Sequence, residues 1–393
     1  MKLSVSVLLI AQIIATVKCA SAKSSPACKN QDGKDVDWFI VYKLPQMQDE
    51  KGFKSDGGRF AYVDARSANG GLKYWPLSHQ DLYKDGNPVA RTLAPLFEKT
   101  ARKDILYFAY NDQPPPEYKG TRNGHTKGVV LFDNTRGVWL LHSVPKFVGG
   151  LHGGQYKFPE SAKGNGQLFM CVTFPTTQLD KIAAILRTEY AKVYAHNKPD
   201  WVTRQRYPEV VDLADESFVR NRDELKVDLT SSGGVTLKAY AKRATTGEDL
   251  YFGMLAKDLG GAIAVQSWRN EPGGKLPNMR KPNCAVLNVD SLVMRFDENI
   301  AVNIKTSKDH SKWAVTVDKD VFCFASMNRM ESQEKRGGEA LCFSNAAVKA
   351  LFRRSAVISE QCPVEEPERK KPRKEPSQKK PSPQSKPSKR GRA

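Results

Sequence analysis

Apolar and β-branched residues recur in short runs along this chain, and two of these runs resemble each other. Residues 125–133 read His-Thr-Lys-Gly-Val-Val-Leu-Phe-Asp, and residues 310–318 read His-Ser-Lys-Trp-Ala-Val-Thr-Val-Asp. The residues after each Lys are mostly apolar or β-branched, which predicts a buried strand. Side chains two positions apart on a strand point to the same face. We therefore expect the His and Lys of each run to lie together.

A polar turn and a second apolar run follow each copy. The turns contain Asn-Thr-Arg-Gly and Asp-Lys-Asp, both of which favour a chain reversal. Ten residues beyond the Asp of the first run comes Ser143, next to His142, and ten beyond that of the second comes Asn328. Each copy is therefore expected to be a strand, a turn and a strand, with a second polar group returned to the same edge.

The remaining pattern mixes strands with helices and predicts a mixed α/β fold. We expect strands at 36–45 and 59–66, a surface helix at 179–194 whose apolar side chains have helical spacing, and a short helix at 345–352. The polar segment 196–216 is expected to bridge two halves, because the two similar runs lie far apart in the chain. The predicted organisation is a signal peptide, an N-terminal lobe, a C-terminal lobe and a disordered basic tail, at residues 1–22, 23–215, 216–362 and 363–393.

If the two strands meet, one face holds two imidazoles and two ammonium groups. Imidazole can attack phosphorus when neutral and can protonate a leaving oxygen when charged. Ammonium groups can stabilise the phosphoryl oxygens as fixed charges. This set predicts phosphodiester hydrolysis that needs no metal and no other cofactor.

These residues resemble the phospholipase D superfamily, whose signature is His-x-Lys, a downstream Asp, and Gly-Ser-x-Asn. The chain departs from it by one extra residue between Lys and Asp, by Ala325 in place of Gly, and by the lack of Asn in the first copy. With those departures it resembles the deoxyribonuclease II family, over roughly residues 26–362. The segments that carry this resemblance are Gly124–Gly128, Trp139–Pro145, Asp309–Trp313, Asn328-Arg with Gln333 and Arg336-Gly-Gly338, Asp37–Phe39, Tyr42–Pro45 and Glu248–Tyr251.

The resemblance implies a phospholipase D-like fold, with two pseudo-symmetric sheet-and-helix lobes that share one active site. It also implies an acid endodeoxyribonuclease that leaves 3′-phosphate and 5′-hydroxyl ends through a phosphohistidine. By the same resemblance, His125 would attack phosphorus, His310 would protonate the leaving oxygen, and Lys127 and Lys312 would stabilise the phosphoryl group. The near symmetry of the two copies leaves the roles of the histidines open to exchange. Contacts with phosphate or DNA would come from Asn328, His142 and Ser143.

The cysteines indicate disulfides in an exported protein. The first 22 residues have a basic start, an apolar stretch too short to span a bilayer, and Ala-Ser-Ala at a cleavage position. Loss of this segment leaves six cysteines, which allow fifteen pairings. The resemblance implies the pairs Cys28–Cys171, Cys284–Cys362 and Cys323–Cys342. Because the chain contains no Cys-x-x-Cys and no His-x-x-x-His, a zinc site is disfavoured.

The net charge of +19 favours a polyanionic partner, and DNA is the obvious one. The tail from residue 363 carries 11 Lys and Arg against 4 Glu, and the body remains basic without it. We expect no membrane segment, and a secreted or lysosomal and phagosomal destination. The absence of an Asn-x-Ser/Thr sequon weighs against sorting through an N-glycan and favours secretion, as in the toxin-like members of the family.

Two other functions compete with the nuclease. One is a different phosphodiesterase of the same superfamily. The other is a secreted toxin that mainly binds DNA through a decayed site, against which both intact His-x-Lys pairs and Asn328 argue. The remaining histidines, at 79, 152 and 196, lack such a context and are expected to be structural or exposed.

Overall fold

The computed structural model describes residues 25–359, apart from residues 51, 99–102, 119–123, 152–153, 218, 271, 273 and 279–284. The predicted signal peptide and the predicted basic tail both lie outside the described residues, as do Cys284, Cys362 and His152. These predictions therefore stay predictions.

Two seven-stranded sheets form the frame of the molecule, and each contains one of the two similar runs. The first sheet is wholly antiparallel and runs, from edge to edge, β11 (Val193–Asn197), β7 (Leu106–Asn111), β8 (Lys127–Phe132), β9 (Arg136–His142), β10 (Gln167–Pro175), β3 (Trp38–Lys43) and β6 (Phe60–Asp64). The second runs β12 (Glu224–Thr230), β13 (Thr236–Lys242), β20 (Gly338–Ser344), β19 (Val321–Ala325), β18 (Trp313–Thr316), β14 (Ile263–Gln266) and β15 (Val286–Asn288), with only β14 and β15 parallel.

The two sheets repeat one topological order around the similar runs. In each sheet, the strand of the His-x-Lys run pairs with the second strand of its hairpin. That second strand pairs with a strand from further along the chain, which pairs in turn with a strand whose last residue is Lys. That order is β8-β9-β10-β3 in the first sheet and β18-β19-β20-β13 in the second. The structure therefore contains a repeat that extends well beyond the two short runs.

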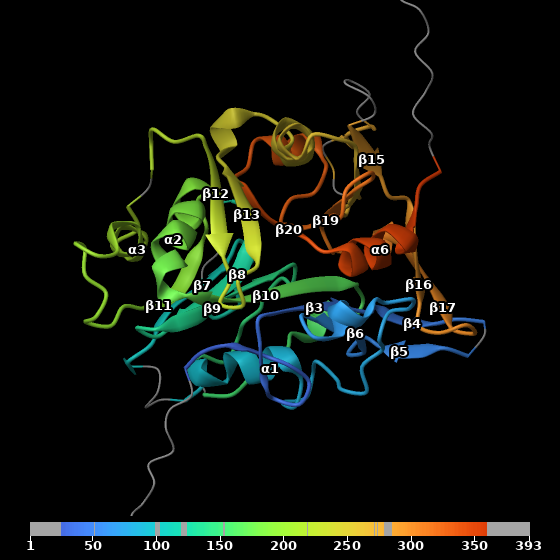
Figure 1. Ribbon diagram of the computed structural model, residues 1–393, viewed down its shortest axis with the longest axis horizontal. Helices are drawn as coiled ribbons and strands as arrows, with labels where there is room; N and C mark the ends of the chain where they lie inside the picture. Colours follow the sequence, from blue (N-terminus) through green and yellow to red (C-terminus); the bar gives the residue numbers. More distant parts are fainter. Residues whose placement is uncertain are drawn as a thin grey trace, which may run out of the picture.

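The largest core cluster joins the inner faces of both sheets. On β3, Trp38, Ile40 and Tyr42 belong to this cluster, whereas Phe39 and Val41 face a second cluster on the outer side, as alternation along a strand requires. Trp38 reaches the second sheet, where its ring lies 5.0 Å from that of Phe343. The helices α2 (Leu179–Thr188) and α6 (Ala346–Ser355) contribute to the same cluster and lie between the sheets (Figure 1). The two lobes thus share one core.

Smaller elements complete the fold. They are the strands β1 (Cys28–Lys29), β2 (Asp35–Val36), β4 (Gln46–Gln48), β5 (Lys54–Asp56), β16 (Ser291–Arg295), β17 (Ala301–Lys305) and β21 (Ala356–Val357), the helices α1 (Pro88–Leu93), α3 (Pro208–Ala214), α4 (Lys257–Leu259) and α5 (Glu331–Glu334), and a π-helix at Leu250–Ala256. Within the described part of the chain, no helix is long and apolar enough to cross a membrane.

The mixed α/β class and both predicted hairpins are confirmed, and the lobe boundaries stay a prediction. The predicted helix at 179–194 was wrong in two respects: it ends at Thr188, with β11 following from Val193, and it is largely buried rather than superficial. Burial of Arg187 is possible because its guanidinium pairs with Glu209 and Asp212.

Two of the three expected disulfides are present among the described residues. Cys28 of β1 is bonded to Cys171 of β10, and Cys323 of β19 is bonded to Cys342, which lies directly opposite on β20. The third expected pair falls outside the described residues.

Candidate active site

The two His-x-Lys runs meet in one cavity at the seam between the lobes. It has a volume of about 420 Å³ and is lined by His125, Lys127, His310 and Lys312, together with Ser143 and Asn328. The other described residues along its wall are Gln113, Pro114, Pro145, Lys146, Ser161, Asn165, Gln167 and Trp268. Six of the seven residues predicted for catalysis or phosphate contact therefore lie together, and His142 does not.

The peptide backbones of both histidines are held by the opposite lobe. The N–H of His125 donates to the carbonyl of Gly337 over 2.8 Å, and the N–H of His310 donates to the carbonyl of Gly166 over 2.9 Å. Neither glycine can be enlarged, since a Cβ at Gly337 would lie 1.9 Å from the carbonyl oxygen of Glu189, and one at Gly166 would lie 2.5 Å from Asp309. Each lobe therefore holds the backbone that carries the other lobe's imidazole.

A buried lysine in turn anchors each of these two loops. Lys43 ends β3 opposite Gln167, and its ammonium donates to the carbonyl of Asn165 over 2.7 Å. Lys242 ends β13 opposite Gly338, and it donates to the carbonyls of Glu334 and Arg336, each over 2.8 Å. The two lysines occupy equivalent places in the two sheets.

Burial perturbs both anchoring lysines. It lowers the pKa of Lys43 to about 7, against the opposing attraction of Asp309, and lowers that of Lys242 to about 8. Charged groups are seldom buried this deeply without a structural or functional reason. Here the reason is structural, because both ammonium groups donate hydrogen bonds to the carbonyls of the two loops.

The ring of His125 is oriented by the C-terminal lobe. Its Nδ1 lies 2.6 Å from Oε1 of Gln333 in α5. Because an amide oxygen only accepts hydrogen bonds, Nδ1 carries the proton in this arrangement. The other ring nitrogen, Nε2, is then left with its lone pair.

The side chain of Lys127 belongs to an ion-pair chain that crosses the seam. Asp112 follows β7 and pairs through one oxygen with Lys127, and through the other, over 2.8 Å, with Arg336 of the C-terminal lobe. Burial alone would raise the pKa of Asp112, but the neighbouring cations, Lys127 first, outweigh it and hold this pKa well below its ordinary value. Asp112 therefore holds the side chain of Lys127 in place through an ion pair.

His310 has different neighbours. The indole of Trp268, which follows β14, lies with its ring centre 4.6 Å from that of the imidazole. In the strand register Trp268 takes the place that Asp112 has in the first lobe, because β14 pairs with β18 as β7 pairs with β8. The ammonium of Lys312 donates to the carbonyl of His310 over 2.9 Å. The two histidines thus share a topology but not an environment.

Both imidazoles resist protonation in the free protein. Burial first, and then the positive charges of Lys312, Lys127 and Lys43, lower the pKa of His310 from 6.5 to about 3. Burial also lowers the pKa of His125 well below its ordinary value, with Lys127 as the next cause. A bound anion would oppose these effects.

The segment that carries Asn328 is fixed from three sides. The hydroxyl of Tyr251 donates to the carbonyl of Met327 over 2.6 Å. The buried guanidinium of Arg329 pairs with Asp249 over 2.8 Å and donates to Asn288 over 2.7 Å. The Glu248–Tyr251 segment singled out in the sequence therefore supports Asn328 rather than lining the cavity.

The hairpin register changes one expected correspondence. Ser143 bonds the backbone of Leu168 on β10, and Ser326 bonds that of Glu339 on β20 in the same way. Ser143 is thus equivalent to Ser326, and the count of ten residues in each copy does not align Ser143 with Asn328. The cause is the shorter second hairpin.

His142 lies behind the cavity rather than in it. Its ring is buried against Phe147 and Phe169, with ring centres 5.1 and 5.7 Å away. Its Nδ1 accepts a hydrogen bond from the backbone of Val144 over 3.2 Å. This position offers His142 no direct contact with a ligand in the cavity.

Two buried carboxyl groups lie close together beneath the first His-x-Lys run. Glu339 of β20 and Glu189, at the end of α2, are both fully buried, and the hydroxyl of Tyr110 donates to the two oxygens of Glu339 over 3.2 and 3.3 Å. Burial raises the pKa of both carboxyls, and the proximity of Glu339 raises that of Glu189 further. The pair retains protons at a pH at which exposed carboxyls have lost them.

Sequence reasoning missed the supporting residues, namely Asp112, Trp268, the two anchoring lysines and the carboxyl pair. Several supporting residues stood in segments that carried the family resemblance, but without a role assigned to them: Gln333, Arg336, Lys43, Asp249, Tyr251 and Arg329. In the described ranges, no group of three or more His, Cys, Asp or Glu is arranged to hold a metal ion.

Comparison with known proteins gives consistent matches over nearly the whole chain. A family model described as Deoxyribonuclease II matches residues 27–362. Plancitoxin-1 of Acanthaster planci is 35% identical over 360 residues, which are 90% of this chain and 97% of that protein. Deoxyribonuclease-2-alpha of Sus scrofa is 34% identical over 342 residues, 85% of this chain and 90% of its own. Cell-death-related nuclease 7 of Caenorhabditis elegans is 32% identical over 340 residues, 85% and 88% respectively.

Proposed function

The chain belongs to the deoxyribonuclease II family, and from this we propose that it is an acid endodeoxyribonuclease whose active site is the cavity at the seam of the lobes. The observation that carries the proposal is the meeting of His125, Lys127, His310 and Lys312 in that cavity. The net charge of +19 suits DNA, a polyanion, as the substrate.

We assign the nucleophile to His125. Its Nδ1–H donates to Gln333, so the lone pair of Nε2 is available for attack. In the first step Nε2 would bond to phosphorus while the bond from phosphorus to the 5′ oxygen breaks. Lys127 and Lys312 would stabilise the phosphoryl oxygens, and both are held by contacts that do not depend on the substrate.

We assign proton transfer to His310, which the C-terminal lobe contributes to the same cavity. As an imidazolium it would protonate the departing 5′ oxygen. As the neutral imidazole it would then take a proton from water, which attacks phosphorus and releases His125. The products carry a 3′-phosphate and a 5′-hydroxyl.

The electrostatics explain why such an enzyme works in acid. The pKa of His310 is lowered to about 3, so its acid form is scarce at neutral pH. An incoming phosphodiester anion favours protonation, and so does a low pH. Activity is therefore expected to fall as pH rises, because the proton on His310 is lost.

The test is plasmid nicking in EDTA across a pH series. We expect cleavage in acid with chelator present, and products whose 3′ ends support polymerase extension only after phosphatase treatment. His125→Ala and His310→Ala should each lose many decades in rate, whereas His79→Ala, at an exposed position, should remain active. Dependence on a divalent metal, or more than a tenth of the activity in either site variant, would contradict the proposal.

We further propose that the protein matures in an oxidising compartment of the secretory pathway and acts outside the cytosol. The disulfides Cys28–Cys171 and Cys323–Cys342 support this. Similarity to plancitoxin-1 makes a secreted toxin the second candidate. The two are separated by applying the His310→Ala protein to cells, because a nuclease loses its effect with its activity and a DNA-binding toxin does not.

A further inference from the structure

A second cavity, of about 580 Å³, lies along the same seam beside the catalytic one. The N-terminal lobe contributes Asp112, Gln113, Gly124 and Tyr190 to it, and the C-terminal lobe contributes residues 243–245 and 335–337. Gln113 lines both cavities, and Asp112 pairs with Lys127 of the first and Arg336 of the second. The two cavities are therefore neighbours along one groove.

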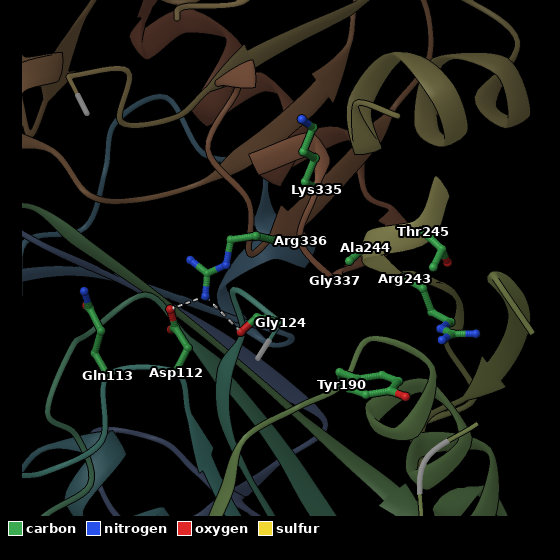
Figure 2. Close-up of a pocket in the computed structure, with 10 residues that line it drawn as sticks. All are labelled: Asp112, Gln113, Gly124, Tyr190, Arg243, Ala244, Thr245, Lys335, Arg336 and Gly337. Atoms are coloured by element: carbon green, nitrogen blue, oxygen red, sulfur yellow. Dashed lines mark hydrogen bonds and ion pairs between the residues drawn. The ribbon is translucent and has the colours of Figure 1, made fainter. Parts of the chain in front are cut away.

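The lining of this second cavity is cationic. Arg243, Lys335 and Arg336 face a single lining carboxylate, that of Asp112, which is already shared with Lys127. Figure 2 shows Arg336 reaching across the seam to Asp112 and to the carbonyl of Gly124, with Lys335 and Arg243 on other sides of the opening. The positive charge that Asp112 does not neutralise favours binding of an anion in this cavity.

One wall combines a cation with an aromatic ring. The guanidinium of Arg243 lies 5.4 Å from the centre of the Tyr190 ring, and it is held there by the carbonyl of Arg220, over 2.7 Å, and by Asp223. Tyr190 has a positive φ of 61°, and its N–H donates to the carbonyl of Arg187 over 3.3 Å. In proteins that bind single-stranded DNA, bases stack on aromatic side chains and phosphates pair with guanidinium groups along a basic groove.

We propose that this cavity, called here the flanking subsite, binds a phosphate and the attached nucleotide of the DNA strand beside the scissile phosphate. Lys335 and Arg243 contact the phosphate, and Tyr190 contacts the sugar or base. The inference rests on the proposed function, because a strand cleaved in the first cavity must leave it along the seam. The ion-pair chain through Asp112 would then couple occupancy of the subsite to the position of Lys127.

The test compares charge changes inside and outside the flanking subsite. Lys335→Glu is the first variant, since Lys335 is exposed and its loss leaves the core intact, and Arg243→Gln is the second. Lys305→Glu is the control matched to Lys335→Glu: it makes the same charge change at an exposed site on β17, far from β13 (Figure 1). All three are made in a His310→Ala background, and binding of a labelled thymidine oligonucleotide is followed by fluorescence anisotropy at several salt concentrations.

Affinity for DNA falls as salt rises, so a plot of log affinity against log salt has a negative slope. Loss of one phosphate contact should make this slope less steep by about 0.7 for single-stranded DNA. We expect this less steep salt dependence in Lys335→Glu and Arg243→Gln and not in Lys305→Glu. In the otherwise wild-type chain, the loss should fall on KM rather than on kcat, because the subsite holds ground state and transition state alike. Slopes in both variants equal to that of the control would overturn the inference.

The two proposals fail separately. Absence of DNA cleavage in EDTA by the wild-type chain removes the proposed function, while the binding comparison still decides the subsite. Cleavage that is unaffected by either variant, together with an unchanged salt slope, removes the subsite alone.

Discussion

The buried carboxyl pair predicts that this protein loses stability as pH rises toward neutrality, and that Glu339→Gln relieves the loss. The substitution keeps an oxygen that can accept the hydrogen bond from Tyr110, and it removes the group that must ionise. Both carboxyls have a pKa raised above 4.5, mainly by burial. Their contribution to stability is therefore complete below the ordinary pKa and is lost as pH rises through the raised value.

The magnitude follows from proton linkage. Each proton that the folded state retains and the unfolded state has lost lowers the unfolding free energy by about 1.4 kcal/mol per pH unit. One such proton thus removes about 3 kcal/mol over two pH units, a large part of the 5–15 kcal/mol that ordinarily holds a domain. The lowered pKa values of the histidines act in the opposite direction below pH 6.5, so the comparison is made as variant against wild type.

Urea unfolding at a series of pH values measures the effect. The stability difference between Glu339→Gln and wild type should grow in favour of the variant from about pH 5 upward, with a slope near that of one proton. Glu298→Gln, at an exposed position paired with Lys73, should follow wild type. Parallel curves for Glu339→Gln and wild type would refute the claim that this pair retains its protons.

Three further predictions concern the active site. Lys312→Gln should lower turnover about a hundredfold and should move the upper limb of the pH–rate profile to higher pH, since loss of this cation raises the pKa of His310; a slower enzyme with an unmoved limb would contradict the electrostatic argument. Gln333→Glu should raise the pKa of His125 and suppress activity at low pH if that imidazole attacks as the neutral base; activity extended to higher pH would instead make His125 the acid. Lys43→Met and Lys242→Met each strip hydrogen bonds from partly buried loop carbonyls, at a cost of about 1 kcal/mol per bond, and should lower kcat more than they raise KM. Losses confined to thermal stability would show that these lysines do not position the histidines.

The residues proposed as catalytic could be picked out from the sequence because they lie within short, local patterns. Each Lys lies at or just before the start of a strand that the following apolar residues specify. The alternation of side chains along a strand predicted that each Lys would share a side with its His. The pairing of the two runs was predictable only through their similarity to each other. Residue counts were a poorer guide. The hairpin of the second copy is two residues shorter, so Ser326, not Asn328, has the position equivalent to that of Ser143.

The supporting residues were not predictable, because their roles arise from contacts between distant segments. Gln333 orients His125 across 208 residues, and Glu339 meets Tyr110 across 229. Lys43 and Lys242 read as ordinary strand ends, and only the register of β3 with β10 and of β13 with β20 reveals their equivalence. The buried position of α2 was also hidden, since Lys and Arg between its apolar residues suggested a solvated face, whereas ion pairs with α3 neutralise Arg187.

The central claim is that His125 forms a covalent bond to phosphorus while His310 transfers protons. Single-turnover cleavage of DNA in chelator at acid pH, quenched in alkali and followed by peptide mass spectrometry, tests it most directly. The account predicts a nucleotide adduct on the peptide that contains His125 in the wild-type chain and none in His125→Ala. An adduct on His310, or cleavage at full rate with no adduct on either histidine, would contradict it.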